Sequence, residues 1–248
     1  MRVLPSSRRA RKWTSIGLVV VVVLAASGFG LNAVSKAPSF QFFGGLTHRV
    51  DTGAKVVALT FDDGPDPAGT RPMLDTLRRA GVPATFYLIG RDIAAHPELA
   101  AEIASAGHEL GNHSYSHDRM VLVTPGWVAA EVERTDELIR RAGHQGEITF
   151  RPPYGRKFLA LPYYLSEHNR RTITWDVAPD SELPADASAQ ALVDNAVEHV
   201  RPGSIILLHG MYAAREPSRR AIEPLIQRLT ADGYRFVTVS ELLAYQGK

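Results

Sequence analysis

The sequence contains no cysteine, so no disulfide bond can stabilise the folded chain. Stability outside the cytoplasm would have to come from an apolar core, and a hydrophobic fraction of 45% over 248 residues is enough for a sizeable one. The chain also lacks internal repeats, which excludes a repeat architecture. Its length fits one α/β domain with an appendage.

A large charge of either sign is also lacking. The net charge is +2, yet five of the 28 basic residues fall within the first 12 positions, where there is no acidic residue. The other 23 basic residues face 26 acidic ones, so the remainder of the chain is slightly acidic. That balance argues against nucleic acid as a partner.

Charge is entirely absent between Trp13 and Ser35, where residues 16–26 are almost wholly aliphatic. A helix over this segment is about 35 Å long, enough to cross the hydrocarbon core of a bilayer. The basic residues before it predict a cytoplasmic N-terminus and an extracytoplasmic globular part. We expect residues 1–35 to form a basic tail and an uncleaved signal anchor. The alternative is a signal peptide cleaved near residues 25–27 or 33–35, which would give a secreted protein.

Strand-like and helix-like patterns alternate after a connecting stretch at 36–54, which we expect to be a linker or short hairpin. The predicted strands are 56–61, 84–89, 109–111, 147–150, 172–175, 204–208 and 235–239. The predicted helices are 70–80, 97–106, 125–142, 161–169, 187–200 and 218–232. About seven strands alternating with helices predict an α/β fold with a parallel sheet over residues 55–248, closed or nearly closed into a barrel.

Polar residues of unusual kinds follow five of these predicted strands. They are Asp62 with Asp63, His113 with His117, Arg151 with Tyr154, Asp176 with Asp180, and His209. Parallel α/β folds assemble their sites at the carboxyl ends of their strands. Core packing does not explain five such coincidences, so the sequence predicts a site there.

Two histidines and one aspartate in this set suit a metal ion. His113 and His117 are four residues apart, so one turn of helix points both imidazoles the same way. With Asp63 they make a two-histidine, one-carboxylate set that leaves a position open for water. This set predicts one divalent metal, most simply zinc, whose bound water becomes acidic enough to act as a nucleophile near neutral pH.

The other residues fit the remaining roles of a hydrolase. Asp62 is free to accept the proton of the water as general base, and Arg151 can keep Asp62 ionised. His209 ends an apolar strand and is interpreted as the general acid that protonates the leaving group. The backbone N–H of Tyr154 follows two prolines that have none, and it can help to stabilise an oxyanion.

The pattern resembles the polysaccharide deacetylases of carbohydrate esterase family 4. Its motifs, in order, are Thr60-Phe61-Asp62-Asp63-Gly64-Pro65, His113-Ser114-x-x-His117, Arg151-x-Pro153-Tyr154 and Leu207-x-His209. The resemblance implies a distorted (β/α) barrel that removes acetyl groups from glycans such as peptidoglycan or chitin-like chains. Residue by residue it implies the same roles: base Asp62, metal ligands Asp63, His113 and His117, acid His209, orienting Arg151 and oxyanion donor Tyr154.

One motif departs from the family pattern. The family usually has Asp-x-x-Asp-Trp after the fifth strand, where an acid supports the catalytic histidine. Here Ala178 occupies the place of an acid and no tryptophan follows. We expect Asp176 or Asp180 to support His209 instead, with Asp176 favoured because it directly follows Trp175.

The sequence therefore predicts a metal-dependent hydrolase that removes acetyl groups, N-acetyl foremost, from a cell-envelope or extracellular glycan. Its expected partners are the glycan and, through the N-terminal helix, the membrane. Two alternatives stay open: a hydrolase of the same fold that acts on a small non-glycan amide, and a non-catalytic glycan-binding relative.

Overall fold

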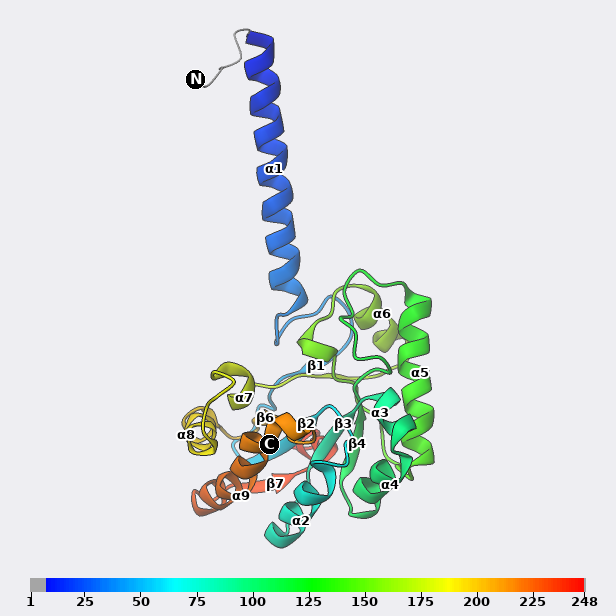
Figure 1. Cartoon of the computed structure of the whole chain (residues 1–248), viewed down its shortest axis with the longest axis vertical. Coiled ribbons are helices and arrows are strands. Elements are labelled where there is room, and N and C mark those ends of the chain that lie inside the picture. Colours follow the sequence, from blue (N-terminus) through cyan, green and yellow to red (C-terminus); the bar gives the residue numbers. More distant parts are fainter. Residues whose placement is uncertain (1–7, 248) are drawn as a thin grey trace.

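The computed structural model describes residues 8–247, so the predicted tail at 1–7, including Arg2, lies outside the described residues. Helix α1 (Arg8–Ser35) extends away from the rest of the chain (Figure 1). Within the described part, one helical segment, Ser15–Ser35, is long and apolar enough to cross a membrane. A signal sequence near an N-terminus passes the same test of length and composition.

Parallel strands form the centre of the globular part of the chain, which follows α1. They are β1 (Leu46–Thr47), β2 (Val56–Asp62), β3 (Thr85–Leu88), β4 (Glu109–Asn112), β5 (Thr172–Ile173), β6 (Ile205–Leu208) and β7 (Arg235–Val237). The larger sheet has the order β4-β3-β2-β6, and β7 pairs with the first half of β2. A separate parallel pair joins β1 to β5. The parallel α/β prediction is confirmed.

Continuous strand pairing does not close the sheet into a barrel within the described residues. The two sheets are linked by isolated bridges, which join Asn112 to Phe150, Phe150 to Thr172 and Val177 to Ile206. The predicted strand at 147–150 is therefore wrong as a strand, because Phe150 alone of these residues forms β-bridges. Phe150 lies between β4 and β5 and bridges to both, without forming a strand.

Helices follow the strands as the parallel arrangement requires. They are α2 (Thr70–Ala80), α3 (Gly90–Ala95), α4 (Pro97–Ser105), α5 (Pro125–Arg141), α6 (Ala160–Glu167), α7 (Pro179–Glu182), α8 (Ala189–His199), α9 (Glu216–Ala231) and α10 (Val239–Leu243). Helix α10 begins where the last strand was predicted to end. Its N-terminus is fixed by a capping box between Thr238 and Glu241.

The main core lies between the larger sheet and the helices that cover it. Buried side chains of β2 and β3, such as Phe61 and Phe86, pack in one cluster with Leu77 of α2, Ile103 of α4 and Leu225 of α9. All seven residues of β2 are buried, so this strand is held on every side. Its carboxyl end is therefore a fixed platform for the residues that follow it.

Candidate active site at the carboxyl ends of the strands

Two adjacent aspartates mark the end of the central strand. Asp62 is the last residue of β2 and is 2% exposed. Asp63 follows with φ of 76°, in the left-handed region that residues with a side chain rarely adopt. The chain therefore turns sharply here and leaves both carboxylates at the carboxyl end of the sheet.

Asp63, His113 and His117 lie together as the sequence predicted. One potential ligand atom from each lies within 4.8 Å of the other two. Asp63 Oδ1 is 3.2 Å from His117 Nε2 and 3.9 Å from His113 Nε2. This oxygen is buried and has no hydrogen-bond partner among the described residues. An orphaned carboxylate oxygen facing two imidazoles is what a divalent cation would satisfy.

His113 is held in the state that a metal ligand needs. Its Nδ1 lies 2.7 Å from the carbonyl oxygen of Arg151, so Nδ1–H donates and the Nε2 lone pair faces Asp62 and Asp63, at 3.6 and 3.9 Å. Burial, together with the neighbouring His117, lowers the pKa of His113 to about 3, against the opposing effect of Asp63. The imidazole is therefore neutral at ordinary pH, and these residues fit a divalent metal ion.

The loop that carries both histidines is fixed by a buried acid that sequence reasoning missed. Glu131 of α5 accepts hydrogen bonds through Oε2 from the backbone N–H groups of Tyr115 and Ser116, at 3.0 and 2.8 Å. A second contact fixes the same turn, because His117 N–H donates to Ser114 Oγ. The sequence does indicate a buried role for Glu131. This charged residue lies three residues after the buried Val128, on the apolar face of an amphipathic helix.

Arg151 is completely buried and binds Asp62. Its Nη1 donates to Asp62 Oδ1 at 2.6 Å and to Thr60 Oγ1 at 2.8 Å, and its Nη2 donates to the Thr174 carbonyl at 3.2 Å. The guanidinium carbon lies 4.0 Å from the centroid of the Tyr87 ring. A buried guanidinium so fixed holds the Asp62 carboxylate in one orientation.

His209 is backed by Asp180 rather than by Asp176, which corrects the favoured prediction. Asp180 Oδ1 is 3.1 Å from His209 Nδ1, and Asp180 Oδ2 accepts from the His209 backbone N–H at 2.6 Å. Asp176 instead accepts from Ser204 Oγ and from the Ile205 backbone N–H, so it joins the end of β5 to the start of β6. The four-residue helix α7 brings Asp180 back over β6, which the sequence pattern did not reveal.

The ionisation of this pair follows from its contacts. Burial opposes a charge on His209, but the hydrogen bond and the negative charge of Asp180, with Asp62 and Asp63 adding, raise the pKa of His209. Burial likewise opposes the charge of Asp180, and the contacts from His209 and Ser218 outweigh it and lower the pKa of Asp180. The pair therefore favours a protonated imidazole beside an ionised carboxylate.

Tyr154 lies at the mouth of the site. It has φ of 58° within the short 3-10 turn Pro153–Gly155, and its side chain is 55% exposed. The ring centroid is 4.7 Å from that of His117, and the guanidinium carbon of Arg119 lies 5.3 Å from the Tyr154 centroid. The turn that carries the predicted backbone donor thus stands directly beside the candidate metal ligands.

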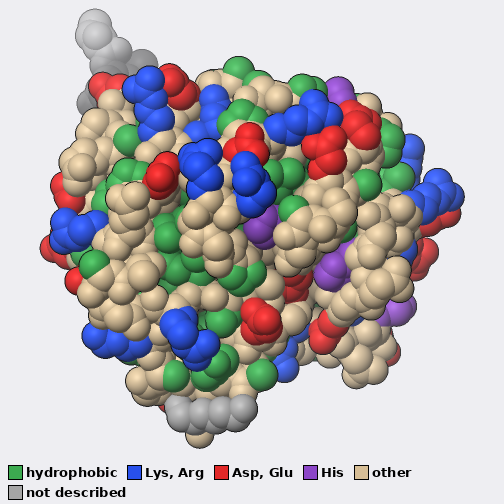
Figure 2. All heavy atoms as spheres, turned by 90° about the horizontal axis from the view of Figure 1, so that it is seen from below, with side chains coloured by type: hydrophobic (Ala, Val, Ile, Leu, Met, Phe, Trp, Pro, Cys, Tyr) green, Lys and Arg blue, Asp and Glu red, His purple; other side chains and the backbone are tan. Residues whose placement is uncertain are grey.

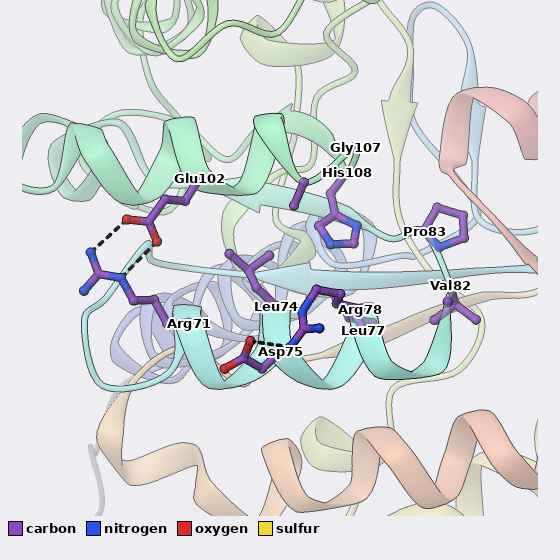
Figure 3. Close-up of a pocket in the computed structure, with 12 residues that line it drawn as sticks. Arg71, Leu74, Asp75, Leu77, Arg78, Val82, Pro83, Glu102, Gly107 and His108 are labelled. Carbon is purple, nitrogen blue, oxygen red and sulfur yellow. Dashed lines mark hydrogen bonds and ion pairs between the residues drawn. The ribbon is translucent and has the colours of Figure 1, made fainter.

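A cavity of about 530 Å³ between α2 and α4 is separate from this site (Figure 3). Its lining residues Pro83 and His108 lie one or two residues before β3 and β4, so it lies at the opposite, amino ends of the strands. The charged side chains along its rim are paired with each other, Arg71 with Glu102 and Arg78 with Asp75. Neither property indicates a catalytic centre.

A parallel α/β sheet whose carboxyl edge gathers an Asp-His-His set, a buried Arg–Asp pair and a His–Asp pair defines a class of candidate metal-dependent hydrolases. A model of the polysaccharide deacetylase family matches residues 49–173. A peptidoglycan-N-acetylglucosamine deacetylase of Bacillus cereus is 32% identical over 203 residues, which cover 82% of this chain and 95% of that protein.

Two further comparisons agree. The peptidoglycan-N-acetylmuramic acid deacetylase PdaC of Bacillus subtilis is 34% identical over 193 residues, which cover 78% of this chain but only 40% of PdaC. A crystal structure of a peptidoglycan N-acetylglucosamine deacetylase, solved in complex with a hydroxamate, matches with a TM-score of 0.76 at 30% identity and covers 82% of this chain and 94% of that one. The chain belongs to the polysaccharide deacetylase family, whose members are hydrolases.

Proposed function

We propose that this chain is a membrane-anchored, metal-dependent deacetylase that removes N-acetyl groups from a cell-envelope glycan. The single observation that carries the proposal is the buried, unpartnered Oδ1 of Asp63 facing His113 and His117. The domain order would be an anchor at 1–35, a connecting segment at 36–54 and a catalytic α/β domain at 55–248, in which isolated bridges link two parallel sheets. Peptidoglycan is the favoured glycan, because the relatives described above are peptidoglycan deacetylases.

The metal site would hold one divalent ion, with zinc the simplest choice for one carboxylate and two imidazoles. When bound, such an ion acidifies water and polarises a carbonyl oxygen. Asp63, His113 and His117 would hold it. The other residues of the site move protons and orient the acetamido group.

Asp62 acts as general base and takes the proton of the attacking water. Its carboxylate is held in place by Arg151, which is itself fixed by Thr60 and Thr174. The Tyr154 backbone N–H donates to the oxygen that becomes negative as the acetamido carbon turns tetrahedral. His209, kept protonated by Asp180, then gives its proton to the leaving amine nitrogen, and acetate and a free amine result.

A hydrolase of the same fold that acts on a small amide would have the same groups, and a glycan-binding relative without activity would not need them. The Arg151–Asp62 and Asp180–His209 pairs favour an active enzyme over the latter. Substrate size separates the remaining two: the proposal requires acetate release from glycan chains.

The test is made on the full-length protein in detergent. We expect about one metal ion per chain, and acetate release from peptidoglycan or from N-acetylglucosamine oligomers that a chelator abolishes. His113→Ala is expected to lose both metal and activity, whereas the exposed His199→Ala at the end of α8 is expected to keep both. Retention of metal and activity by His113→Ala would contradict the proposed site. Release of acetate from a small amide alone would favour the alternative substrate.

A further inference from the structure

An apolar surface lies on the outside of the globular region that follows α1, which we call the catalytic part. We call it the anchor-side surface, and its exposed residues are Phe40, Phe42, Phe43, Leu122, Leu159 and Tyr163, which are between 41% and 75% exposed. A groove of about 380 Å³ runs through it, lined almost entirely by apolar atoms. Single exposed apolar residues are ordinary, but a contiguous group of this kind marks an interaction site.

The aromatic rings of this surface hold one another in place. Phe40 packs edge-on against Phe42 at a centroid distance of 5.2 Å, and Phe42 packs in the same way against Phe158 at 5.5 Å. Phe43 packs against Tyr163 at 5.6 Å. Rings from the connecting segment and from the chain around α6 thus form one ordered surface.

The anchor-side surface adjoins the end of α1. Lys157 N–H donates to the Ser35 carbonyl at 2.8 Å, and Lys157 Nζ donates to the Ala37 carbonyl at 2.7 Å. Arg156 Nη1 also donates to Asn32 Oδ1 at 2.8 Å. Since Asn32 and Ser35 belong to the last turn of the apolar span, the catalytic part meets α1 where that span ends.

We propose that the anchor-side surface rests on the outer leaflet of the bilayer that α1 spans. This rests on the membrane anchoring in the proposed function. Surfaces that lie on a bilayer bury Phe, Trp and Leu side chains at the boundary between headgroups and acyl chains, and Phe40, Phe42 and Phe43 follow the span within eight residues of Ser35. On the face opposite α1, Lys and Arg side chains are instead interspersed with Asp and Glu (Figure 2). The anchor-side surface therefore suits contact with lipid, whereas the opposite face suits contact with water.

This contact would also place the active site close to the membrane. Met120 pairs with Lys157 in an isolated bridge, and Leu122 follows in the same loop. His117 lies earlier in the same loop, and Tyr154 lies three residues before Lys157 with its ring 4.7 Å from that of His117. The candidate site and the anchor-side surface are thus built from the same two segments, so a leaflet touching the surface lies next to the mouth of the site.

The absence of cysteine allows a direct test, because one introduced cysteine is the only site for a thiol-reactive fluorophore. The probes are Leu122→Cys and Tyr163→Cys in the full-length chain, with Gln227→Cys on α9, away from α1, as the matched control (Figure 1). Each labelled protein is reconstituted in vesicles of phosphatidylethanolamine and phosphatidylglycerol with a quencher attached to the lipid acyl chains. We expect several-fold stronger quenching at positions 122 and 163 than at 227.

Several outcomes would overturn the proposal. Equal quenching at all three positions would show that the surface lies no closer to lipid than the control position on α9. Label-to-label contact between copies without lipid quenching would assign the surface to a second copy of the chain. A protein that does not float with the vesicles would remove the anchoring on which the proposal rests. None of these measurements needs turnover, so they are independent of whether the site deacetylates a glycan.

Discussion

Asp62 and Asp63 are neighbours in the chain, yet their carboxylates have different surroundings. Asp62 is bound by the guanidinium of Arg151 and has His113 Nε2 3.6 Å from its Oδ2. Asp63 faces both imidazoles, and its Oδ1 has no hydrogen-bond partner among the described residues. The residue types alone predicted that Arg151 would pair with Asp62 and that Asp63 would lie with the two histidines. They did not predict the contacts of Thr60 and Thr174 with Arg151, since small polar residues in or next to a strand have no distinctive pattern.

The first prediction concerns Asp62. Asp62→Asn is expected to lower turnover by about 10²–10⁴-fold, because an amide cannot take the proton of the water. Metal content is expected to stay near that of the wild type, since the amide keeps the shape of the side chain and Asp63 still offers its oxygen. Acetate release and metal analysis on the same preparation check both. Turnover within threefold of the wild type would remove Asp62 from the role of base.

The second prediction distinguishes the two acids after β5. Asp180 raises the pKa of His209, so Asp180→Asn should lower it. A general acid is active while protonated, so the alkaline limb of the pH–rate profile is expected to move to lower pH and the maximal rate to fall. Asp176→Asn should keep the wild-type profile, because Asp176 binds Ser204 and Ile205 instead. An unshifted limb in Asp180→Asn would show that another group supports His209.

At the scale of elements, long periodic segments were predictable and short ones were not. The bounds of α2 agree to the residue, because a glycine cap ends an amphipathic run there. Helices α3 and α7, of six and four residues, are too short to show a period. Their positions are set by tertiary contacts, and this is why the partner of His209 could not be read from the sequence.

The third prediction concerns helix α5, whose Glu131 fixes the turn between the two histidines. Glu131→Gln removes the charge from the acceptor of two backbone N–H groups, and we expect metal affinity to fall by about 10–100-fold, as for other residues that orient metal ligands. Glu137→Gln on the exposed face of the same helix is the matched control. Competition with a chromophoric chelator measures both affinities. Equal affinities would show that the turn keeps its shape without the charge.

At the scale of the whole molecule, the class of fold and the edge of the sheet that carries the site followed from the alternation of strands and helices. The way in which the two sheets meet could not be predicted from that alternation, because single bridges such as those at Phe150 leave no pattern in the sequence. The packing of the α1 end against Arg156 and Lys157 was likewise not predictable, since it joins segments more than 100 residues apart.

The fourth prediction concerns α1. The full-length protein is expected in the membrane fraction, resistant to extraction by salt and by carbonate, because an uncharged helix of this length is stable in hydrocarbon. Fractionation followed by mass determination of the mature chain checks this. A shortened soluble species that begins near Gly28 or Lys36 would instead establish cleavage of a signal peptide.

The contact of Lys157 with Ala37 leaves almost no free tether between α1 and the catalytic part. A long flexible tether would let an enzyme sample a deep layer of the cell wall, whereas a joint of this kind confines it to a thin shell at one height. Strands of glycan would then be modified as they pass through that shell. Under the proposed function, free amines would accordingly be introduced only in the material next to the cell surface, and older, outer layers would preserve a record of how active the enzyme was when they were made.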